Sequence, residues 1–341
     1  MAETVFPGAE WERADPEAAG LDPDGLRAAE RWQRERLGDD PSRIVVVRGG
    51  RLVFEASSGM GADERVRIAS AAKSVYSSVL AIAVEEGVIP SADAKVVDVF
   101  PRMMDVPEGQ GPKPGRFARP KDRGITFRQL IGNTSGYLKP DEKPGEHFHY
   151  QTFGMNILTH AVAAAYGLYD AADPEGSPGF ARLVAGRIAE PIGAEFDYAL
   201  TNFPGVESPA LGVFGYYTQV LTNARDAARL GWLWCNAGRW GDRQVIPGEW
   251  MREATGVSRE VREHEPHDRW QYGLGFWTNE AGELWPGLPT DGFAALGAGG
   301  HTIVVFPSLE LVVATVPGFV YPKESRGNPE FLKLIVDSVR E

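Results

Sequence analysis

The chain has 341 residues, enough for two domains or one large one, and its 43% hydrophobic and 24% charged residues are typical of a globular protein with a substantial core. Its formal net charge of −12 argues against a general binder of nucleic acid or anionic membranes, which needs a basic face. A single cysteine, Cys235, excludes an internal disulfide framework and a cysteine-rich zinc site.

Two further features concern location. No apolar run reaches the roughly 18–20 residues of a membrane span. The start of the chain also lacks a basic region followed by an apolar stretch, the pattern of a secretion signal. We therefore expect no membrane association and a cytoplasmic location, and a secreted form trimmed of its signal would look the same.

The first predicted elements are a helix and a hairpin. Asp22-Pro23 combines an N-cap with a proline at the first helical position, which predicts a helix that runs to Leu37 and stops at Gly38. Two β-branched runs follow, Arg43–Arg48 and Leu52–Ala56. The two glycines between these runs predict a hairpin turn.

The strongest local signal is the pair Ser70 and Lys73. They precede an apolar periodic run from Val75 to Val84 that Gly87 ends, so the pattern predicts a helix with the serine near its N-terminus. Positions i and i+3 share a helix face, so the two side chains are expected to point the same way. A serine hydroxyl needs a base, and a lysine can act as one where burial and a nearby cation favour its neutral amine. Ser-x-x-Lys alone is common by chance. The alternative is therefore that Ser70 only caps the helix.

The middle of the chain, residues 76–268, is rich in helices and loops. Its clearest helical stretches are Ala161–Ala165 and Ala224–Gly238. The Pro/Gly-rich segment Pro107–Arg123 is a long loop, and loops of that length in compact proteins are often functional.

The C-terminal region mirrors the N-terminal one. The predicted elements are the strands Gln271–Trp277, Thr302–Phe306 and Leu309–Thr315, a turn at Pro307-Ser308, and a helix Glu330–Val339 capped by Asn328-Pro329. Together the two ends predict one antiparallel sheet. We therefore expect an α+β fold, with a sheet domain of residues 1–75 and 269–341, an inserted mostly helical domain of residues 76–268, and an active site at their interface.

Three segments carry a resemblance to a known family. Ile68–Gly87, Ile125–Tyr137 and Asp226–Gly238 resemble the serine β-lactamase and penicillin-binding-protein superfamily, specifically its class C-like serine hydrolases and esterases. The resemblance extends from Phe6-Pro7 to the last helix in the expected order. It implies a β-lactamase/transpeptidase-like fold with an antiparallel sheet flanked by the terminal helices.

The resemblance also implies a second catalytic element. The family carries Tyr-x-Asn on a loop of the helical domain, and the corresponding stretch here looks like Phe148–Gly154, with Tyr150 as the tyrosine and Thr152 in place of the asparagine. A tyrosine can act as a base if a cation such as Lys73 stabilises its phenolate or if the proton moves in concert. The alternative is an interface aromatic residue that only hydrogen-bonds through its hydroxyl.

The third family element lies on the strand that flanks the site, and here it resembles Ala294–His301. By similarity, the N–H groups of Ser70 and Ala298 would form the oxyanion hole. A slip of one or two residues in the alignment leaves Gly297 and Gly300 as rivals for the second position. The alternative is a glycine-rich strand edge or bulge.

The same element bears on the substrate. Its stretch lacks the lysine that holds the substrate carboxylate in β-lactam specialists, which moves the chain towards the esterase and amide-hydrolase branch that includes 6-aminohexanoate-dimer hydrolase-like enzymes. Residues expected to contact the substrate are Thr152, Gly299, Gly300 and His301.

The sequence therefore predicts a serine hydrolase of a small ester or amide. Ser70 would form an acyl-enzyme, and Lys73 and Tyr150 would move the protons. The alternatives are a β-lactamase, a D-amino-acid peptidase, or a non-catalytic ligand-binding member of the same fold. The sequence does not indicate the oligomeric state.

We expect no metal and no other cofactor. The pairs His147-x-His149 and His264-x-x-His267 could hold zinc in principle. Their spacing, however, does not match the two histidines of a His-Glu-x-x-His helix.

Overall fold

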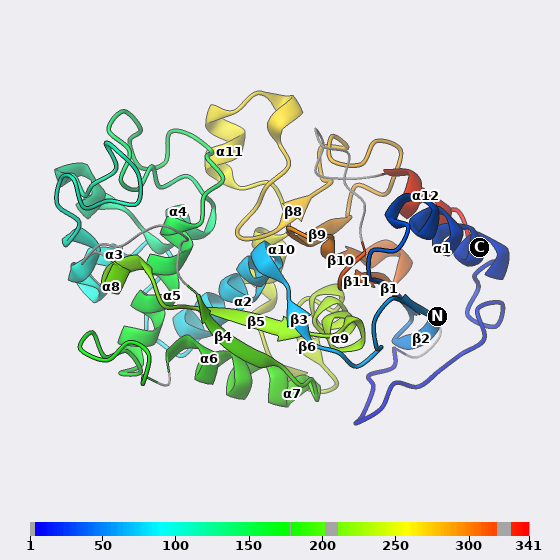
Figure 1. The fold of residues 1–341 in the computed structure, drawn as a ribbon. Helices are drawn as coiled ribbons and strands as arrows, with labels where there is room; N and C mark the ends of the chain where they lie inside the picture. The colour runs from blue at the N-terminus through cyan, green and yellow to red at the C-terminus, as the bar shows by residue number, and fades with distance from the viewer. Residues whose placement is uncertain (1–3, 178, 202–210, 319–328, 341) are drawn as a thin grey trace.

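The computed structural model describes residues 4–177, 179–201, 211–318 and 329–340. Its centre is a six-stranded antiparallel sheet with the strand order β2-β1-β11-β10-β9-β8, so strands from the two ends of the chain lie side by side. In Figure 1 this sheet extends from the centre to the right of the molecule, where both termini lie, and the helices of residues 96–165 lie on the left. This is the α+β architecture expected for a β-lactamase/transpeptidase-like fold.

The strands of the sheet are β1 (Ser42–Arg48), β2 (Arg51–Ser58), β8 (Trp277–Thr278), β9 (Phe293–Gly297), β10 (His301–Phe306) and β11 (Leu311–Thr315). A second sheet contains β3 (Val66–Arg67), β5 (Tyr217–Thr222) and β4 (Asp197–Thr201), in that order, and β6 (Arg239–Trp240) pairs with β7 (Arg243–Gln244).

The helices are α1 (Pro23–Leu37), α2 (Ala72–Glu85), α3 (Val96–Val99), α4 (Phe127–Ile131), α5 (Phe153–Ala165), α6 (Gly179–Val184), α7 (Glu190–Ile192), α8 (Leu211–Phe214), α9 (Ala224–Cys235), α10 (Gly248–Ala254), α11 (Arg259–His264) and α12 (Pro329–Val336). A 3-10 turn, η1 (Ala69–Ala71), leads into α2.

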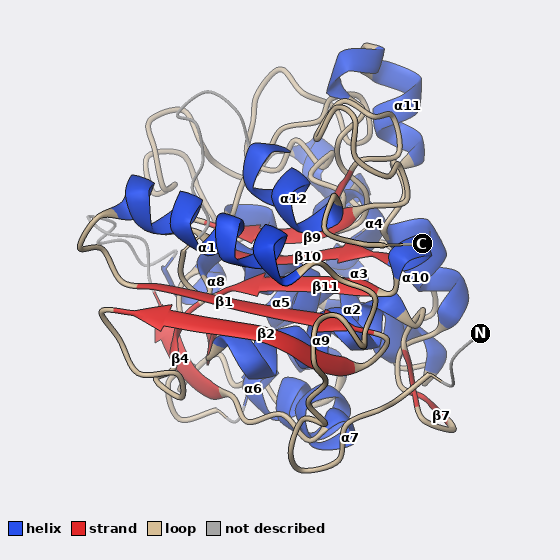
Figure 2. Ribbon diagram, turned by 90° about the vertical axis from the view of Figure 1, so that its right-hand side faces the viewer, coloured by secondary structure: helices blue, strands red, loops and turns tan. Residues whose placement is uncertain are grey.

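The sheet is buried on both faces. Helices α1 and α12 cover one face, as Figure 2 shows, and residues such as Val46 and Val304 form a core beneath them. The neighbouring residues Val45 and Val305 face the other way, into the core that α2 and α9 share with the sheet. The alternation along each strand thus divides the apolar side chains between two cores.

Helix α9 lies unusually close to the sheet because of Gly231. A Cβ at this position would lie only 2.4 Å from Val312 Cγ1 and 2.8 Å from Ile303 Cγ2. Helix α9 falls inside the predicted insertion of residues 76–268 and yet packs against β1, β10 and β11. The domain boundaries stay a prediction.

Most elements predicted at the two ends are confirmed. Helix α1 starts after its cap Asp22 and ends before Gly38, and β1 pairs with β2 as a hairpin. Strands β10 and β11 match their predicted positions, although β11 starts only at Leu311 because residues 307–309 form a 3-10 turn. The predicted cap Asn328 lies outside the described residues, and α12 ends at Val336 rather than Val339.

The predicted strand Gln271–Trp277 is wrong except for its last residue. The alternating pattern suits a strand, but Gly275 has a φ of +88° and the N–H of Gly273 donates to Phe276 O at 2.9 Å, so the chain turns. An added Cβ at Gly273 would lie 2.1 Å from Ala254 O. The small side chains therefore serve close packing in a loop, and β8 is only two residues long.

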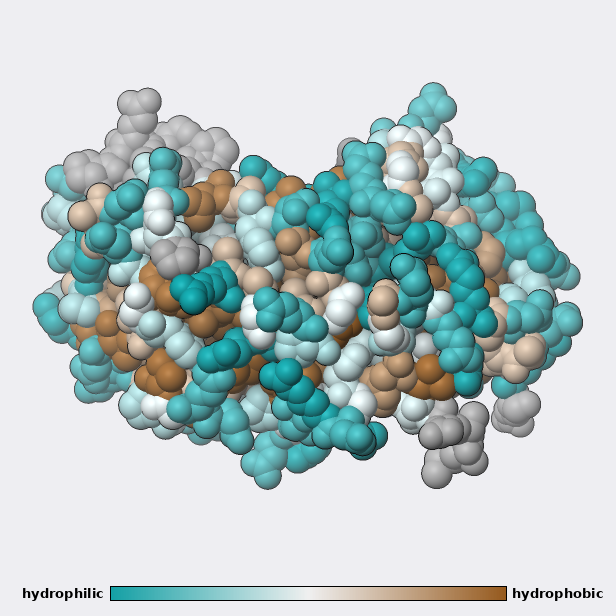
Figure 3. All heavy atoms as spheres, turned by 90° about the horizontal axis from the view of Figure 1, so that it is seen from below, coloured by the Kyte–Doolittle hydropathy of each residue, from teal (hydrophilic) through white to brown (hydrophobic). Residues whose placement is uncertain are grey.

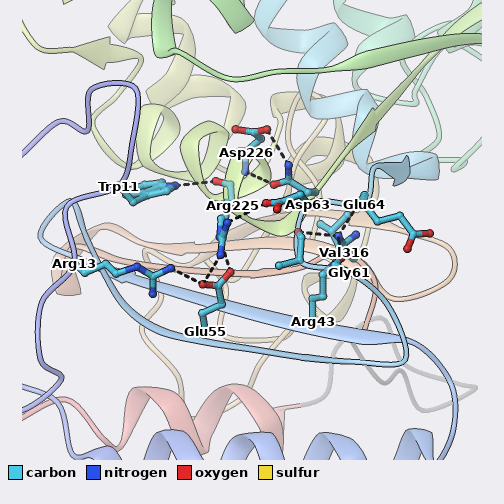
Figure 4. Close-up of polar contacts among 12 residues, drawn as sticks. Trp11, Arg13, Arg43, Glu55, Gly61, Asp63, Glu64, Arg225, Asp226 and Val316 are labelled. Carbon is cyan, nitrogen blue, oxygen red and sulfur yellow. Dashed lines mark hydrogen bonds and ion pairs between the residues drawn. The ribbon is translucent and has the colours of Figure 1, made fainter.

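Buried arginines anchor the segment that joins β2 to β3. Arg43 is 2% exposed, and its guanidinium donates to the carbonyl oxygens of Gly61, Ala62, Glu64 and Val316. Figure 4 shows these contacts beside the Arg225–Glu55–Arg13 cluster.

Arg225 holds the same segment from its other side. It pairs with Glu55 at 2.6 Å and with Asp63 at 2.9 Å. The segment leads directly to β3 and then to Ser70, so its anchoring fixes where the chain enters the turn that carries the serine.

Polar side chains predominate around the outer parts of the molecular surface. In the view from below, hydrophobic patches are broken up by hydrophilic side chains (Figure 3). Leu200, at 40%, is the one large hydrophobic side chain that counts as exposed among the described residues. In the same residues, none of the helices combines the length and apolar character of a membrane span.

His160 on α5 makes the stability of the fold depend on pH. Burial lowers its pKa to about 4 from the 6.5 of a free imidazole, against the raising effect of its hydrogen bond to Gly215 O. Between these values the unfolded chain binds a proton that the folded chain does not, so stability is complete above pH 6.5 and declines as the pH falls towards 4.

We expect the free energy of unfolding to fall between pH 7 and 4 by about 3 kcal/mol more in the wild type than in His160→Gln, which cannot titrate. Urea unfolding at a series of pH values measures this difference. His264→Gln removes an exposed histidine, and its free energy of unfolding should fall with pH as that of the wild type does. If the free energy of unfolding of His160→Gln fell with pH as steeply as that of the wild type, this would contradict the assignment of the pH dependence to His160.

Candidate active site

Ser70 lies on a tight turn rather than within a regular helix. It is the middle residue of η1, and α2 begins two residues later, at Ala72. The residue before it, Ala69, has a φ of +50°, a left-handed conformation that costs energy for a residue with a Cβ. The N–H of Ile68 donates to Val220 O at 3.1 Å, which ties the start of the turn to the small sheet.

Helix α2 is buried on every side from Ala72 to Ala83. Its polar side chains find partners in neighbouring elements: Ser74 Oγ donates to Gly275 O at 2.7 Å, and Ser77 Oγ accepts from Trp250 Nε1 at 3.1 Å. A helix held in this way has little freedom to rotate or slide. The side chains in its first turn are therefore fixed relative to the rest of the molecule.

The hydroxyl of Ser70 and the amine of Lys73 are in contact. Lys73 Nζ lies 2.8 Å from Ser70 Oγ, a hydrogen-bonding distance, and Lys73 is only 3% exposed. Among the residues described, no carboxylate forms an ion pair with Lys73, so the serine is its hydrogen-bonding partner. A half-buried hydroxyl that touches a buried amine has the geometry that an activated nucleophile requires.

Tyr150 lies next to this pair. Lys73 Nζ is 4.8 Å from the centre of the Tyr150 ring, within the range of a cation–π contact. The ring packs against Trp277, with centroids 5.3 Å apart, and against the edge of Tyr272 at 5.8 Å. The aromatic neighbours restrict where the phenol can point.

Asn133 holds the backbone on both sides of Tyr150. Its carbonyl oxygen accepts from the N–H of His149 at 2.8 Å, and its side-chain oxygen accepts from the N–H of Gln151 at 2.9 Å. Its amide donates to Tyr272 Oη at 3.2 Å. Asn133 is buried and has a φ of +58°, a conformation that asparagine adopts more readily than most residues.

The end of β9 approaches the serine turn very closely. An added Cβ at Gly297 would lie 2.1 Å from Ile68 O and 3.0 Å from the N–H nitrogen of Ala71. Only a glycine permits this contact, and Ala298 is the next residue in the chain. The position suits the second donor of an oxyanion hole, and the choice between Ala298 and its rivals Gly297 and Gly300 stays a prediction.

Two cavities adjoin these residues. The first, which we call the nucleophile pocket, has a volume of about 240 Å³ and is lined by Arg67, Ala69, Ser70, Lys73, Tyr76, Thr152, Thr201, Tyr217 and Gln219. The second, which we call the basic pocket, has a volume of about 340 Å³ and is lined by Lys113, Arg116, Tyr137, Leu138, Lys139, His149, Tyr150, Gln151, Thr152 and Phe153.

Thr152 belongs to both pockets and is the N-cap residue of α5. Its side chain makes no capping hydrogen bond, so its hydroxyl is not committed to the helix. The structure thus brings Ser70, Lys73, Tyr150 and Thr152 together, and their roles in catalysis remain proposals.

The other predicted contacts lie further along the β9–β10 turn. The lining of the nucleophile pocket, as far as the structure describes it, does not include Gly299, Gly300 or His301. Burial and the charge of Arg43 lower the pKa of His301 to about 4, so its imidazole is neutral at pH 7. The part of these three residues in substrate binding stays a prediction.

The sequence did not predict the residues that line the nucleophile pocket on the side that faces Ser70. Tyr217 and Gln219 are alternate residues of β5, are buried, and face the serine from the small sheet. Arg67 on β3 reaches the same pocket. Their segments carry no motif, and only the pairing of β3 with β5 brings them to the site.

Comparison with known families identifies the fold. The sequence matches the Beta-lactamase family profile over residues 33–336, which is most of the chain. The chain belongs to the beta-lactamase family.

Solved structures show the same fold. A protein from Bacteroides dorei assigned as a beta-lactamase superimposes with a TM-score of 0.70 and 20% identity, over 94% of this chain and 99% of that one. A protein from Bacillus anthracis assigned as a 6-aminohexanoate-dimer hydrolase gives a TM-score of 0.62 and 15% identity, over 96% and 86%.

A family VIII carboxylesterase gives a TM-score of 0.64 and 15% identity, over 93% of this chain and 97% of that one. The beta-lactamase fold is thus shared here by proteins with beta-lactamase, hydrolase and carboxylesterase names. Comparison with curated protein sequences finds no match.

We expect Gly297→Ala to push β9 away from the serine turn. The added methyl group would overlap a backbone oxygen that cannot move freely, so the free energy of unfolding should fall by about 1–3 kcal/mol. Labelling of Ser70 by a fluorophosphonate should slow by about tenfold if the shift weakens a bound oxyanion by roughly 1.4 kcal/mol.

Gly186→Ala is the matched control, because a Cβ there would meet no atom within 4 Å. It should unfold and label as the wild type does. Wild-type stability and labelling in Gly297→Ala would show that the close approach has no consequence for the site.

Proposed function

We propose that the protein is a serine hydrolase that cleaves a small ester or amide through an acyl-enzyme on Ser70. The observation that carries this proposal is the 2.8 Å contact between Ser70 Oγ and Lys73 Nζ beside an open pocket. Tyr150, packed against the same amine, supports it as the second proton-transfer group.

In the first half of the reaction, Ser70 Oγ attacks the carbonyl carbon of the substrate. Its proton passes directly to Tyr150 if the lysine has stabilised the phenolate. Otherwise it passes to Lys73, which hands it on to Tyr150 after Tyr150 has protonated the leaving group. The carbonyl oxygen becomes an oxyanion held by the N–H groups of Ser70 and Ala298. The tetrahedral intermediate collapses, the bond to the leaving group breaks, and Tyr150 supplies the proton that this alcohol or amine takes with it.

In the second half, water attacks the acyl carbon. Tyr150 or Lys73 takes one proton of the water and returns it to Ser70 Oγ when the ester bond to the enzyme breaks. The acid product leaves and the serine is restored. The left-handed backbone before Ser70 and the burial of α2 support this role, because they hold the hydroxyl at the pocket in one position.

Esters and simple amides suit the site better than β-lactams. Strand β9 offers no cation, because its residues are Phe293-Ala294-Ala295-Leu296-Gly297. Thr152 stands where an asparagine is usual and has one hydroxyl in place of an amide. Among the structural relatives, the carboxylesterase and the protein assigned as an amide hydrolase point the same way.

Three substitutions test the catalytic roles. Ser70→Ala should abolish turnover of p-nitrophenyl butyrate and labelling by a fluorophosphonate, because no nucleophile remains. Lys73→Met and Tyr150→Phe should each lower kcat by about 10²–10⁴, the usual contribution of a positioned acid or base. Steady-state kinetics and intact-protein mass spectrometry measure these effects.

Ser57→Ala and Tyr166→Phe are matched controls on the surface, outside both site pockets, and should keep wild-type rates. Full turnover by Ser70→Ala would refute the assignment of the nucleophile. A wild-type protein with neither turnover nor labelling would favour a non-catalytic, ligand-binding member of the family.

A separate measurement compares substrate classes. Without a lysine on β9 to hold the β-lactam carboxylate, kcat/KM for nitrocefin should be at least about 100-fold lower than for p-nitrophenyl butyrate, the loss expected for one to two missing charge-assisted hydrogen bonds. A D-amino-acid amide in the same panel tests peptidase activity. Nitrocefin turnover as efficient as ester turnover would identify a β-lactamase instead.

A further inference from the structure

The basic pocket is positively charged although the chain as a whole is negative. The chain carries a formal net charge of −12, yet the pocket is lined by Lys113, Arg116, Lys139 and His149 and by no acidic residue among those described. The nucleophile pocket likewise has Arg67 and Lys73 in its described lining and no acid. A concentration of one sign of charge in a concave site attracts ligands of the opposite sign.

Two of these cations are not neutralised by the protein. The side chains of Lys113 and Arg116 form no ion pair or hydrogen bond with any of the described residues. Lys113 is exposed and Arg116 is half-buried at the wall of the pocket. A guanidinium without an ion pair offers N–H donors in a planar arrangement that matches the two oxygens of a carboxylate.

The loop that carries both residues has a defined shape. The N–H of Arg116 donates to Lys113 O at 3.0 Å, which closes a turn between them. Gly111 allows the chain to fold back on itself, because an added Cβ would lie 1.4 Å from Arg116 O. The N–H of Ala118 donates to Val106 O at 2.8 Å and closes the base of the loop.

The other two basic groups are already partnered. Lys139 is 4% exposed and binds both oxygens of Glu142, at 2.6 and 2.7 Å, and His149 Nδ1 lies 3.1 Å from the same carboxylate. Burial lowers the pKa of Lys139 against this ion pair, and the charges of Arg116 and Lys121 lower it further. Lys139 is therefore neutralised by Glu142, and the unpaired charge of the pocket lies in the loop with Lys113 and Arg116.

The basic pocket is continuous with the catalytic residues. Thr152 lines both pockets, Ser70 lines only the nucleophile pocket, and Tyr150 lines only the basic pocket. Under the proposed mechanism Tyr150 gives its proton to the leaving group. The basic pocket is therefore on the side from which the leaving group departs, and the nucleophile pocket takes the acyl chain.

We propose that the basic pocket is a subsite for an anionic leaving group, and that the substrates of this protein are esters or amides whose alcohol or amine fragment carries a carboxylate or a similar oxyanion bound by Arg116 and Lys113. This inference rests on the proposed function and adds the substrate class to it. The charge on the acyl fragment is predicted to matter less, because that fragment lies in the other pocket.

Matched esters test the subsite. The first pair is 4-butyryloxybenzoate and 4-butyryloxybenzamide, which share the acyl chain and differ in the charge of the leaving phenol. The second pair, phenyl hydrogen adipate and phenyl hexanoate, places the charge on the acyl side. We expect the wild type to prefer the charged member of the first pair by about tenfold in kcat/KM at low salt, and to show little preference in the second.

Variants assign the preference to residues. Arg116→Gln should lower the kcat/KM ratio of 4-butyryloxybenzoate to 4-butyryloxybenzamide by about tenfold, and Lys113→Gln by about threefold because its ammonium is more exposed. Lys143→Gln removes an exposed lysine of the neighbouring loop, paired with Glu146, and should keep the wild-type ratio. Added salt should reduce the wild-type ratio and leave that of Arg116→Gln nearly unchanged.

The outcomes separate the two proposals. Equal rates on the first pair, or an undiminished ratio in Arg116→Gln, would overturn the subsite and leave the serine hydrolase intact. If neither an ester nor an amide is turned over and Ser70 is not labelled, the hydrolase proposal fails. Calorimetric binding of 4-hydroxybenzoate to the wild type and to Arg116→Gln then still decides the subsite. Weaker binding of 4-hydroxybenzoate to Arg116→Gln than to the wild type supports the subsite. Equal binding to the two proteins, or no binding to the wild type, refutes it.

Discussion

The contact between Ser70 Oγ and Lys73 Nζ is the interaction on which the proposed chemistry of this protein depends. A hydroxyl and an amine three residues apart meet readily at the start of a helix, but on a mobile surface helix such a pair would be hydrated and variable. Here the amine is 3% exposed, and the helix that carries it is buried from Ala72 to Ala83. The packing around α2 therefore turns a local spacing into a fixed geometry.

Several elements meet at this helix, and each contributes one part of the site. The small sheet binds the backbone before the serine, through the N–H of Ile68. The end of β9 closes in from the other side, where Gly297 removes the Cβ that would prevent contact. A loop from the helical region supplies Tyr150, held by Asn133 and by the aromatic side chains of Tyr272 and Trp277. The site thus lies where several segments distant in sequence converge.

The electrostatic character of the site differs from that of the molecule. A chain with a net charge of −12 repels anions at long range, so an anionic substrate must be attracted locally by groups that the protein itself does not neutralise. The loop with Lys113 and Arg116 places two such groups beside Tyr150. This positive charge lies on a different element from β9, which carries no cation.

The sequence alone determined the local elements and the pairing of residues that are close in the chain. The proline and glycine around α1, the glycines between β1 and β2, and the spacing of Ser70 and Lys73 act through backbone conformation within a few residues, and the structure reproduces them. The predicted strand Gln271–Trp277 was wrong because close packing around Gly273 and Gly275 decided the path of that segment.

Only the tertiary structure decided which distant groups share the site. The approach of Gly297 to Ile68 and the hydrogen bonds of Asn133 on both sides of Tyr150 depend on contacts between segments far apart in the chain. The same holds for Gln219 in the wall of the nucleophile pocket and Arg116 in the wall of the basic pocket. Such contacts form through packing of whole helices and strands, so no short pattern in the sequence specifies them.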